Sequence, residues 1–228
     1  MSPLPPIFSQ AFDRSLDAQT RILKSSLRLD NAVANCTKSG IPSIAISPSQ
    51  GQYLALLCQL MQAKSVLEVG TLGGYSTIWI ASVPGIHVTS IEFNPKHRDV
   101  ALENTKGLDN VGVHLGAAAD IMPKLAKDGK VFDFVFIDAN WDQQALYFDL
   151  AVNMTRKGGA IYVDNVVRNL LDVPEEGDEA DWSLIEHVKN DERVSATLMP
   201  TLSTHKVDVK GLGDKRRESD WRTGLATV

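Results

Sequence analysis

The sequence has little of what marks several specialised protein classes. It contains only two cysteines, Cys36 and Cys58, in 228 residues, too few for a disulfide framework or a cysteine-based zinc site. No run of about 18 apolar residues occurs, which argues against a membrane-spanning helix. The N-terminus has three prolines and lacks the basic start and apolar core of a signal peptide. These absences predict a cytoplasmic protein with free thiols and no membrane contact.

An excess of positive charge is also missing. The net charge is -5 and the pI is near 5.5, whereas nucleic-acid binders usually carry a basic face. We therefore expect a small-molecule partner and no nucleic acid. Hydrophobic residues make up 43% of the chain and charged residues 22%, which suffices for a full core. A length of 228 residues fits one α/β domain, so residues 1–228 are predicted to form a single domain.

Short apolar or β-branched runs alternate with helical stretches over most of the chain. Residues 9–38 show helical spacing of apolar side chains, and Ser47-Pro48 is typical of a helix start. The expected strands are 65–70, 87–93, 111–115, 132–138, 160–165, 194–202 and 223–228. Such alternation predicts a mostly parallel seven-stranded sheet with helices on both faces. We predict insertions at the acidic stretch 173–181 and at the mixed-charge stretch 210–222, both on the solvated surface. The alternative for the acidic stretch is a lid over the substrate.

A glycine turn follows the first expected strand. Gly70, Gly73 and Gly74 stand where backbone must approach a ligand and open a helix. Their spacing differs from the dinucleotide pattern GxGxxG. Glu92, which ends the second expected strand, has the position of a carboxylate that accepts hydrogen bonds from a ribose diol. An ordinary strand-turn-helix with an exposed glutamate is the alternative.

Charge beside this turn bears on which ligand it holds. Glu68 stands two residues before Gly70, whereas a pyrophosphate would favour a helix N-terminus without a nearby acid. A ligand with a positive amino or sulfonium group fits better. An NAD-linked oxidoreductase shares the glycine turn and the ribose acid, but we find no accompanying Tyr/Lys or His hydride relay.

Two apolar strand runs end abruptly in oxygen ligands. "FDFVFID" ends in Asp138, and "GGAIYVDN" ends in Asp164 and Asn165. Ligands of open parallel sheets bind beyond the carboxyl ends of the strands, so these side chains are expected at one edge. Helix caps that follow the strands are the alternative explanation.

Five segments together resemble a known family. They are "VLEVGTLGGYSTIWIA", "VTSIEFNP", "LGAAADIMPKL", "FDFVFIDANW" and "KGGAIYVDNVV". In this order they resemble the cation-dependent, S-adenosylmethionine-dependent O-methyltransferases, the group of catechol and caffeoyl-CoA O-methyltransferases. The resemblance spans about residues 43–167. It implies a Rossmann-like methyltransferase fold, an N-terminal helical extension over 1–45, and a homodimer with the apolar N-terminal helices as interface.

The resemblance also implies a cofactor site for S-adenosylmethionine. Glu68, Gly70 and the turn 73–76 would face the methionine part, with Ser76 at its carboxylate. Glu92 would hold the ribose. The full implied set is Ile44, Ile46, Glu68, Gly70, Gly74, Tyr75, Ser76, Glu92, Ala117, Ala118 and Asp138. In it, Ala117 and Ala118 lie at the adenine edge, and the two isoleucines close the pocket.

Asp138, Asp164 and Asn165 match the family's three metal ligands. Two carboxylates and an amide form a hard oxygen set that suits Mg²⁺ or another hard divalent cation. Such a cation orients two adjacent acceptor oxygens and lowers the pKa of the attacking hydroxyl. The expected reaction is methyl transfer to a small acceptor, for which a vicinal diol on an aromatic ring is the natural form.

One position departs from the family. Trp141 stands where the family usually has a lysine, and tryptophan cannot accept a proton. Three explanations can account for a reaction without this lysine. The metal can acidify the hydroxyl with water as proton acceptor, which we favour; His205, Lys206 or Asp142 can replace the lysine; or the acceptor is already ionised. Asp138 and His205 are the catalytic candidates. Trp141 forms an aromatic wall for the acceptor ring or an ordinary packing contact, and a cofactor-binding protein with altered or lost catalysis is an alternative function.

Overall fold

The computed structural model describes residues 6–24, 26–166, 183–203 and 220–227. Seven strands form one sheet in the order β3-β2-β1-β4-β5-β7-β6. The first five run parallel, and β7 is antiparallel to both β5 and β6. Their bounds are β1 Ser65–Val69, β2 His87–Glu92, β3 Val111–Leu115, β4 Phe132–Ile137, β5 Thr155–Val163, β6 Ser195–Ser203 and β7 Asp220–Thr227. The predicted mostly parallel seven-stranded sheet is confirmed.

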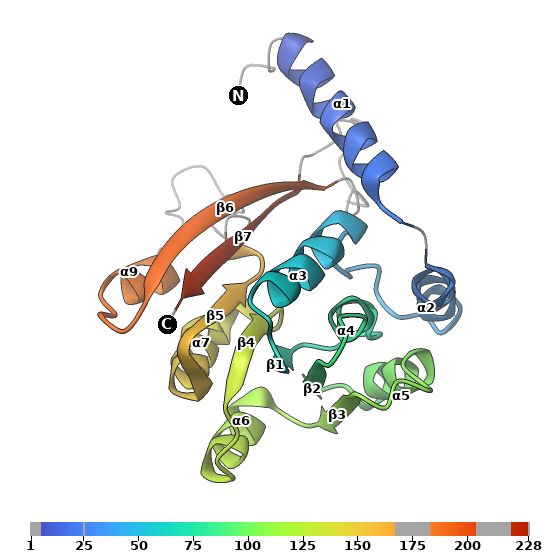
Figure 1. The fold of residues 1–228 in the computed structure, drawn as a ribbon. Coiled ribbons are helices and arrows are strands. Elements are labelled where there is room, and N and C mark those ends of the chain that lie inside the picture. The colour runs from blue at the N-terminus through green and yellow to red at the C-terminus, as the bar shows by residue number, and fades with distance from the viewer. Residues whose placement is uncertain (1–5, 25, 167–182, 204–219, 228) are drawn as a thin grey trace.

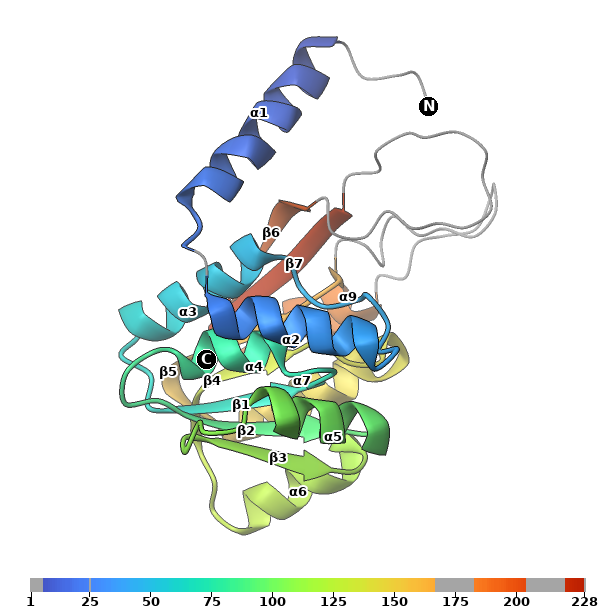
Figure 2. The ribbon, with the colours of Figure 1, turned by 90° about the vertical axis from the view of Figure 1, so that its right-hand side faces the viewer.

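Helices cover both faces of this sheet (Figures 1 and 2). One face carries α2, α3, α4 and α5, and the other carries α6, α7 and α9. The described helices are α1 Pro6–Ile22, α2 Leu27–Lys38, α3 Pro48–Leu60, α4 Tyr75–Ala81, α5 Pro95–Asn104, α6 Ala118–Lys127, α7 Gln144–Met154 and α9 Ser183–Lys189, with the 3-10 turn η1 Trp141–Gln143. None of the helices in the described ranges is long and apolar enough to cross a membrane.

Strand alternation divides the core into two clusters. Val66, Phe134 and Tyr162 point toward α3 and α4, whereas Leu67 and Val135 point toward α6 and α7. Successive residues of a strand face opposite sides of a sheet, so each buried strand supplies both clusters. The parallel strands read as nearly continuous apolar runs for this reason.

The N-terminal region forms two helices, as the spacing over residues 9–38 predicted. α2 packs against α4 and α5 through Leu29 and Ala32, which are buried. α1 extends away from the rest of the chain in both views (Figures 1 and 2). α3 begins where predicted, because Ser47 is its N-cap and Pro48 its first residue.

The start of β7 differs from the prediction. β7 begins at Asp220, inside the stretch 210–222 that was expected to be an insertion. Pairing with β6 explains the earlier start, because Ser203, Leu202 and Thr201 align with residues 220–222. The acidic stretch 173–181 lies outside the described residues, so its prediction as surface or lid stays open.

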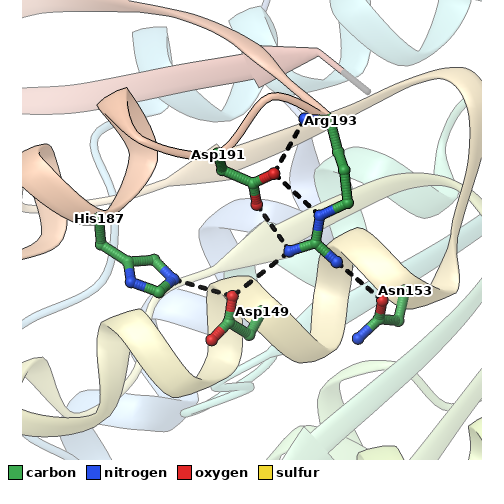
Figure 3. Close-up of polar contacts among 5 residues, drawn as sticks. All are labelled: Asp149, Asn153, His187, Asp191 and Arg193. Atoms are coloured by element: carbon green, nitrogen blue, oxygen red, sulfur yellow. Dashed lines mark hydrogen bonds and ion pairs between the residues drawn. The ribbon is translucent and has the colours of Figure 1, made fainter.

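A polar cluster joins α9 to α7 (Figure 3). Nε2 of His187 lies 2.8 Å from Oδ1 of Asp149, and Arg193 donates two hydrogen bonds to the Asp191 side chain, at 2.8 and 2.6 Å. Arg193 also donates to Asn153 at 3.0 Å. Hydrogen bonding from Arg193 lowers the pKa of Asp191 to about 2. The cluster attaches α9 and the turn before β6 to α7.

Candidate functional site

Two acidic side chains follow neighbouring parallel strands. The N–H of Asp138 donates to the carbonyl of Val69 at 2.8 Å, and the N–H of Asp164 donates to the carbonyl of Ile137 at 2.8 Å. Both residues therefore extend the sheet ladder one step beyond β4 and β5. Adjacent strands lie about 5 Å apart, so the structure brings these two predicted site residues to one edge.

The glycine turn packs directly on the first of these acids. Gly70 has φ +99°, and a Cβ there would collide with the carbonyl oxygen of Asp138. Only glycine combines this backbone conformation with this close approach. The turn after β1 and the end of β4 thus form one continuous surface.

The Glu92 carboxylate supports the turn from β2. Its Oε2 accepts the Leu72 N–H at 2.7 Å and its Oε1 accepts the Asn94 N–H at 2.8 Å. Leu72 has φ 50°, which is uncommon for a bulky side chain. Glu92 therefore stabilises a strained turn, and its carboxylate still has lone pairs for further donors because each oxygen accepts about two hydrogen bonds.

Glu68 lies beneath the turn. Its side chain is completely buried, and Ser76, Thr77 and Ser90 each donate a hydroxyl hydrogen bond to it at 2.5 Å. Burial raises the pKa of Glu68; the three hydrogen bonds oppose this effect, and the nearby Glu92 charge adds to it. The predicted pair Glu68 and Ser76 is thus brought together, with the Ser76 hydroxyl engaged by the acid.

Asp164 and Asn165 are both buried at the end of β5. Asn165 has φ 65°, a left-handed conformation that asparagine tolerates better than most residues. Its Nδ2 is buried without a hydrogen-bond partner. Gln50 of α3 donates to Oδ1 of Asp164 at 2.8 Å, and Gln144 of α7 donates to the Asp164 carbonyl at 2.9 Å. Asp164 is thus held from both faces of the sheet.

The remaining predicted cofactor residues surround the turn or start the next helix. Gly74 is the N-cap of α4 and Tyr75 its first residue, and both are buried. A cavity of about 60 Å³ beside the turn is lined by Ile46, Leu72 and Tyr75, among others. Ile46 is buried and Ile44 is 51% exposed, so these two isoleucines occupy different environments.

The predicted adenine edge adjoins Glu92. Ala117 is the N-cap residue of α6 and Ala118 its first, buried residue. The N–H of Gly116 donates to the Glu92 carbonyl at 2.8 Å. The start of α6 therefore lies beside the end of β2, at the same edge as Gly70 and Asp138.

The candidates for proton transfer are less completely placed. Trp141 opens the 3-10 turn η1 and is half-buried, and Asp142 beside it is exposed. His205 and Lys206 lie outside the described residues. Of the predicted catalytic pair, the structure thus positions Asp138 alone.

A larger cavity lies on the face of the sheet that α7 and α9 cover. It has a volume of about 390 Å³ and is lined mainly by apolar side chains of α7, α9 and β6, with Val163 and Val166 at its inner wall. The predicted site residues are absent from the described lining. Val163 and Val166 directly flank Asp164 and Asn165 in the chain, so the cavity adjoins the end of β5.

Sequence reasoning missed the residues that hold the acids in place. Gln50, Gln144 and Thr77 carry no local signal, because each acquires its partner only when distant elements pack together. Ser90 gave the one usable hint. It follows the same alternation as Glu68 on the neighbouring strand, in direct register.

The family profile of the O-methyltransferases matches residues 15–204. The O-methyltransferase imqG of Aspergillus flavus is 42% identical over 195 residues, 79% of this chain and 79% of that protein. The catechol O-methyltransferase of Mycobacterium tuberculosis is 39% identical over 184 residues, 78% of this chain and 80% of the relative.

Solved structures agree with these relatives. The O-methyltransferase of Bacillus cereus in complex with SAH has a TM-score of 0.81 and 29% identity, covering 96% of this chain and 99% of that one. TomG of Streptomyces achromogenes, an O-methyltransferase in complex with SAM, has a TM-score of 0.80 and 28% identity, covering 96% and 97%. The chain belongs to the S-adenosylmethionine-dependent O-methyltransferase family.

Proposed function

We propose that this methyltransferase acts on one hydroxyl of a small aromatic vicinal diol, with a divalent cation held by Asp138, Asp164 and Asn165. The observation that carries the proposal is the adjacency of Asp138 and Asp164 at neighbouring strand ends, beside Gly70. The catechol O-methyltransferase among the relatives supports the substrate class.

The chemistry of the three side chains fits Mg²⁺. The described residues contain no group of three His, Cys, Asp or Glu side chains that could hold a metal. The proposed set is of a different kind, because it consists of two carboxylates and the amide of Asn165. Hard oxygen ligands of this kind favour Mg²⁺, Mn²⁺ or Ca²⁺ over zinc. The Glu92 carboxylate adds negative charge beside the turn, which favours cationic ligands at this edge.

The chain's own residues would position the two reactants. The glycine turn and Glu92 would hold the cofactor by its methionine part and its ribose, with the start of α6 at the adenine. In the reaction the sulfonium C–S bond breaks, the C–O bond forms and the acceptor hydroxyl loses its proton, giving the methyl ether and SAH. Alignment of acceptor oxygen and methyl is the main contribution of such a site. A divalent cation would supply Lewis acidity that lowers the pKa of the acceptor hydroxyl.

Because position 141 is not a lysine, another group must accept the proton of the acceptor hydroxyl. We favour water as the proton acceptor, because Trp141 cannot take a proton. Asp142, His205, Lys206 or an ionised acceptor group are the alternatives. The Trp141 ring would then serve as an aromatic wall for the acceptor.

Family membership excludes one of the sequence-based alternatives. An NAD-linked oxidoreductase does not fit, because two relatives that match this chain over 79% and 80% of their own length are O-methyltransferases. A cofactor-binding protein with lost catalysis would bind the methyl donor and leave every acceptor unmethylated. The test below separates this case.

Methyl transfer from labelled S-adenosylmethionine tests the proposal with three matched acceptors: catechol, resorcinol and phenol. Catechol alone presents two adjacent oxygens, so it should be methylated with Mg²⁺ and much more slowly with a chelator. The pH dependence of turnover with and without Mg²⁺ should show activity at lower pH when the cation is present. Activity indifferent to the chelator would rule out the metal.

A pair of variants controls for the charge change. Asp164→Asn should lower turnover at least about 100-fold, because it removes a carboxylate ligand. Asp109→Asn, which changes an exposed carboxylate in the turn before β3, should leave turnover unchanged. Equal rates with catechol and resorcinol would contradict the vicinal-diol proposal while leaving methyl transfer in place.

Assembly and location belong to the same proposal. Large apolar side chains of the N-terminal helices are exposed, with Ile22 at 71% and Leu27 at 76%. A homodimer that buries them would resemble ordinary subunit interfaces. The two free thiols suit the reducing cytoplasm. Sedimentation of the wild type and of Leu27→Lys would test the dimer, because the added charge should weaken the interface.

A further inference from the structure

Gln50 contacts the proposed metal ligand Asp164 from the N-terminal part of the chain. Its Nε2 donates to Oδ1 of Asp164 at 2.8 Å across 114 positions of sequence. Both side chains are almost completely buried, at 3% and 0% exposed. An ionised carboxylate only accepts hydrogen bonds, so the Gln50 amide must present its NH₂ to Asp164 and turn its oxygen away.

The start of α3 fixes the position of Gln50. The Ser47 hydroxyl accepts the Gln50 N–H at 3.2 Å, and Pro48 sets the first helical residue. Next to it, Gly51 lies so close to Trp79 of α4 that a Cβ would collide with the indole. The helix therefore cannot shift along α4 without a clash.

The next turn of α3 repeats the contact with β5. Tyr53, three residues after Gln50, packs against Tyr162 with ring centroids 6.2 Å apart. Tyr162 stands two residues before Asp164, on the same face of the strand. Residues at i and i+3 of a helix share a face, so Gln50 and Tyr53 meet Asp164 and Tyr162 in order. Two contacts fix the register of α3 on β5.

The energetics of Gln50 suggest more than packing. Its Oε1 is buried without a hydrogen-bond partner, which is less favourable than an apolar side chain of the same shape. A buried glutamine with one oxygen unsatisfied is therefore a poor way to fill the space. Its NH₂, in contrast, points one carboxylate oxygen in a fixed direction. This arrangement is typical of the residues that orient metal ligands from behind.

We infer that Gln50 is a positioning residue, which holds the Asp164 carboxylate in the orientation that binds a divalent cation. The inference rests on the proposed metal site. Gln50 thereby connects α3 to the acids at the strand ends. Because its amide donates to the Asp164 carboxylate, the effect of Gln50 should appear in cation affinity and leave cofactor affinity unchanged.

Gln144 offers a matched control. It is equally buried, at 2% exposed, and also leaves its Oε1 without a partner. Its Nε2 donates to the main-chain carbonyl of Asp164 and not to the carboxylate. A purely structural role would make the two glutamines equivalent, whereas orientation of the carboxylate would distinguish them.

Direct binding of Mn²⁺ to the full-length chain tests the inference, by calorimetry or by the loss of the free-ion electron spin resonance signal. Gln50→Met keeps the volume and removes the amide, and Gln144→Met does the same at the control position. Gln50→Met should weaken Mn²⁺ binding about tenfold or more. Gln144→Met should change it less than about threefold, and neither variant should change the affinity for SAH.

The outcomes separate the inference from the proposed function. If the wild type binds no Mn²⁺, the metal site fails and the inference fails with it. If the wild type binds Mn²⁺ and Gln50→Met binds it equally well, or if both variants weaken it equally, the positioning role alone is overturned. Should Gln50→Met not fold, Gln50→Asn, which withdraws the amide by one methylene, must show the same loss.

Discussion

The carbonyl oxygen of Asp138 occupies the space where a side chain on Gly70 would have to stand. The contact joins the turn after β1 to the end of β4, so the proposed cofactor turn and the proposed metal edge share one backbone contact. A disturbance at Gly70 should therefore reach both.

Gly70→Ala should be strongly destabilising. The alanine must adopt φ +99° and also displace the Asp138 carbonyl. The left-handed conformation alone costs about 1–2 kcal/mol, and with the collision we expect a loss of about 3 kcal/mol or more. Urea unfolding measures this loss, and calorimetry with SAH should show weakened binding in any folded fraction.

Gly107→Ala is the matched control for that variant. Gly107 has φ +82°, and a Cβ there would meet nothing within 4 Å. Only the conformational cost of about 1–2 kcal/mol applies, and SAH binding should be unchanged. Equal losses in the two variants would show that the contact with Asp138 has no energetic weight.

Glu68→Gln should change how stability depends on pH. Burial raises the pKa of Glu68 above its usual value of 4.5 in the folded protein. The folded state therefore holds the proton more tightly than the unfolded state, and the stability from this group is complete below pH 4.5 and is lost as pH rises through the folded pKa. The wild type should lose stability relative to Glu68→Gln as pH rises above 4.5.

Urea unfolding of the ligand-free protein at several pH values measures this difference. Glu192→Gln changes an exposed glutamate and should leave the pH profile of the wild type unaltered. A constant difference in stability between wild type and Glu68→Gln over this range would mean that the hydroxyls of Ser76, Thr77 and Ser90 fully offset the burial of the charge.

The strand-end acids could be predicted because their signal is local. "FDFVFID" is an apolar run that stops at an acid, and parallel topology alone brings the ends of such strands to one edge. The turn glycines are similarly local, since each satisfies a backbone requirement of its own position. The sheet, its helices and the clustering of Asp138, Asp164 and Gly70 follow from these patterns.

The supporting contacts could not be predicted in the same way. Gln50 reaches Asp164 only because α3 packs in one register on β5, and no feature near Gln50 specifies that register. The burial of Glu68 depends likewise on the packing of α4 over β1, because α4 supplies Ser76 and Thr77. Three-dimensional packing decides these contacts, and a single sequence shows only the residues that take part.

Asp149→Ala should have a small effect, although the cluster in Figure 3 contains several ion pairs. His187 and Asp149 are 38% and 42% exposed, and exposed pairs contribute at most about 1 kcal/mol. We expect a loss of about 0.5–1 kcal/mol in urea unfolding, compared with almost none for Asp17→Ala, whose partner Arg21 lies on the more exposed α1. A loss above about 2 kcal/mol would show that the attachment of α9 to α7 is cooperative.

Trp141→Lys should supply the proton acceptor that the wild type lacks. A positioned general base typically contributes about 100-fold or more to a reaction rate. We therefore expect kcat with catechol at pH 7 to rise about tenfold and the pH profile to shift to lower pH. Loss of the aromatic face should raise KM, because stacking contributes about 0.5–1.5 kcal/mol. Trp141→Phe keeps the face and adds no base, so its pH profile should match the wild type. If the Trp141→Lys profile also matches, the proton leaves by a route that does not pass residue 141.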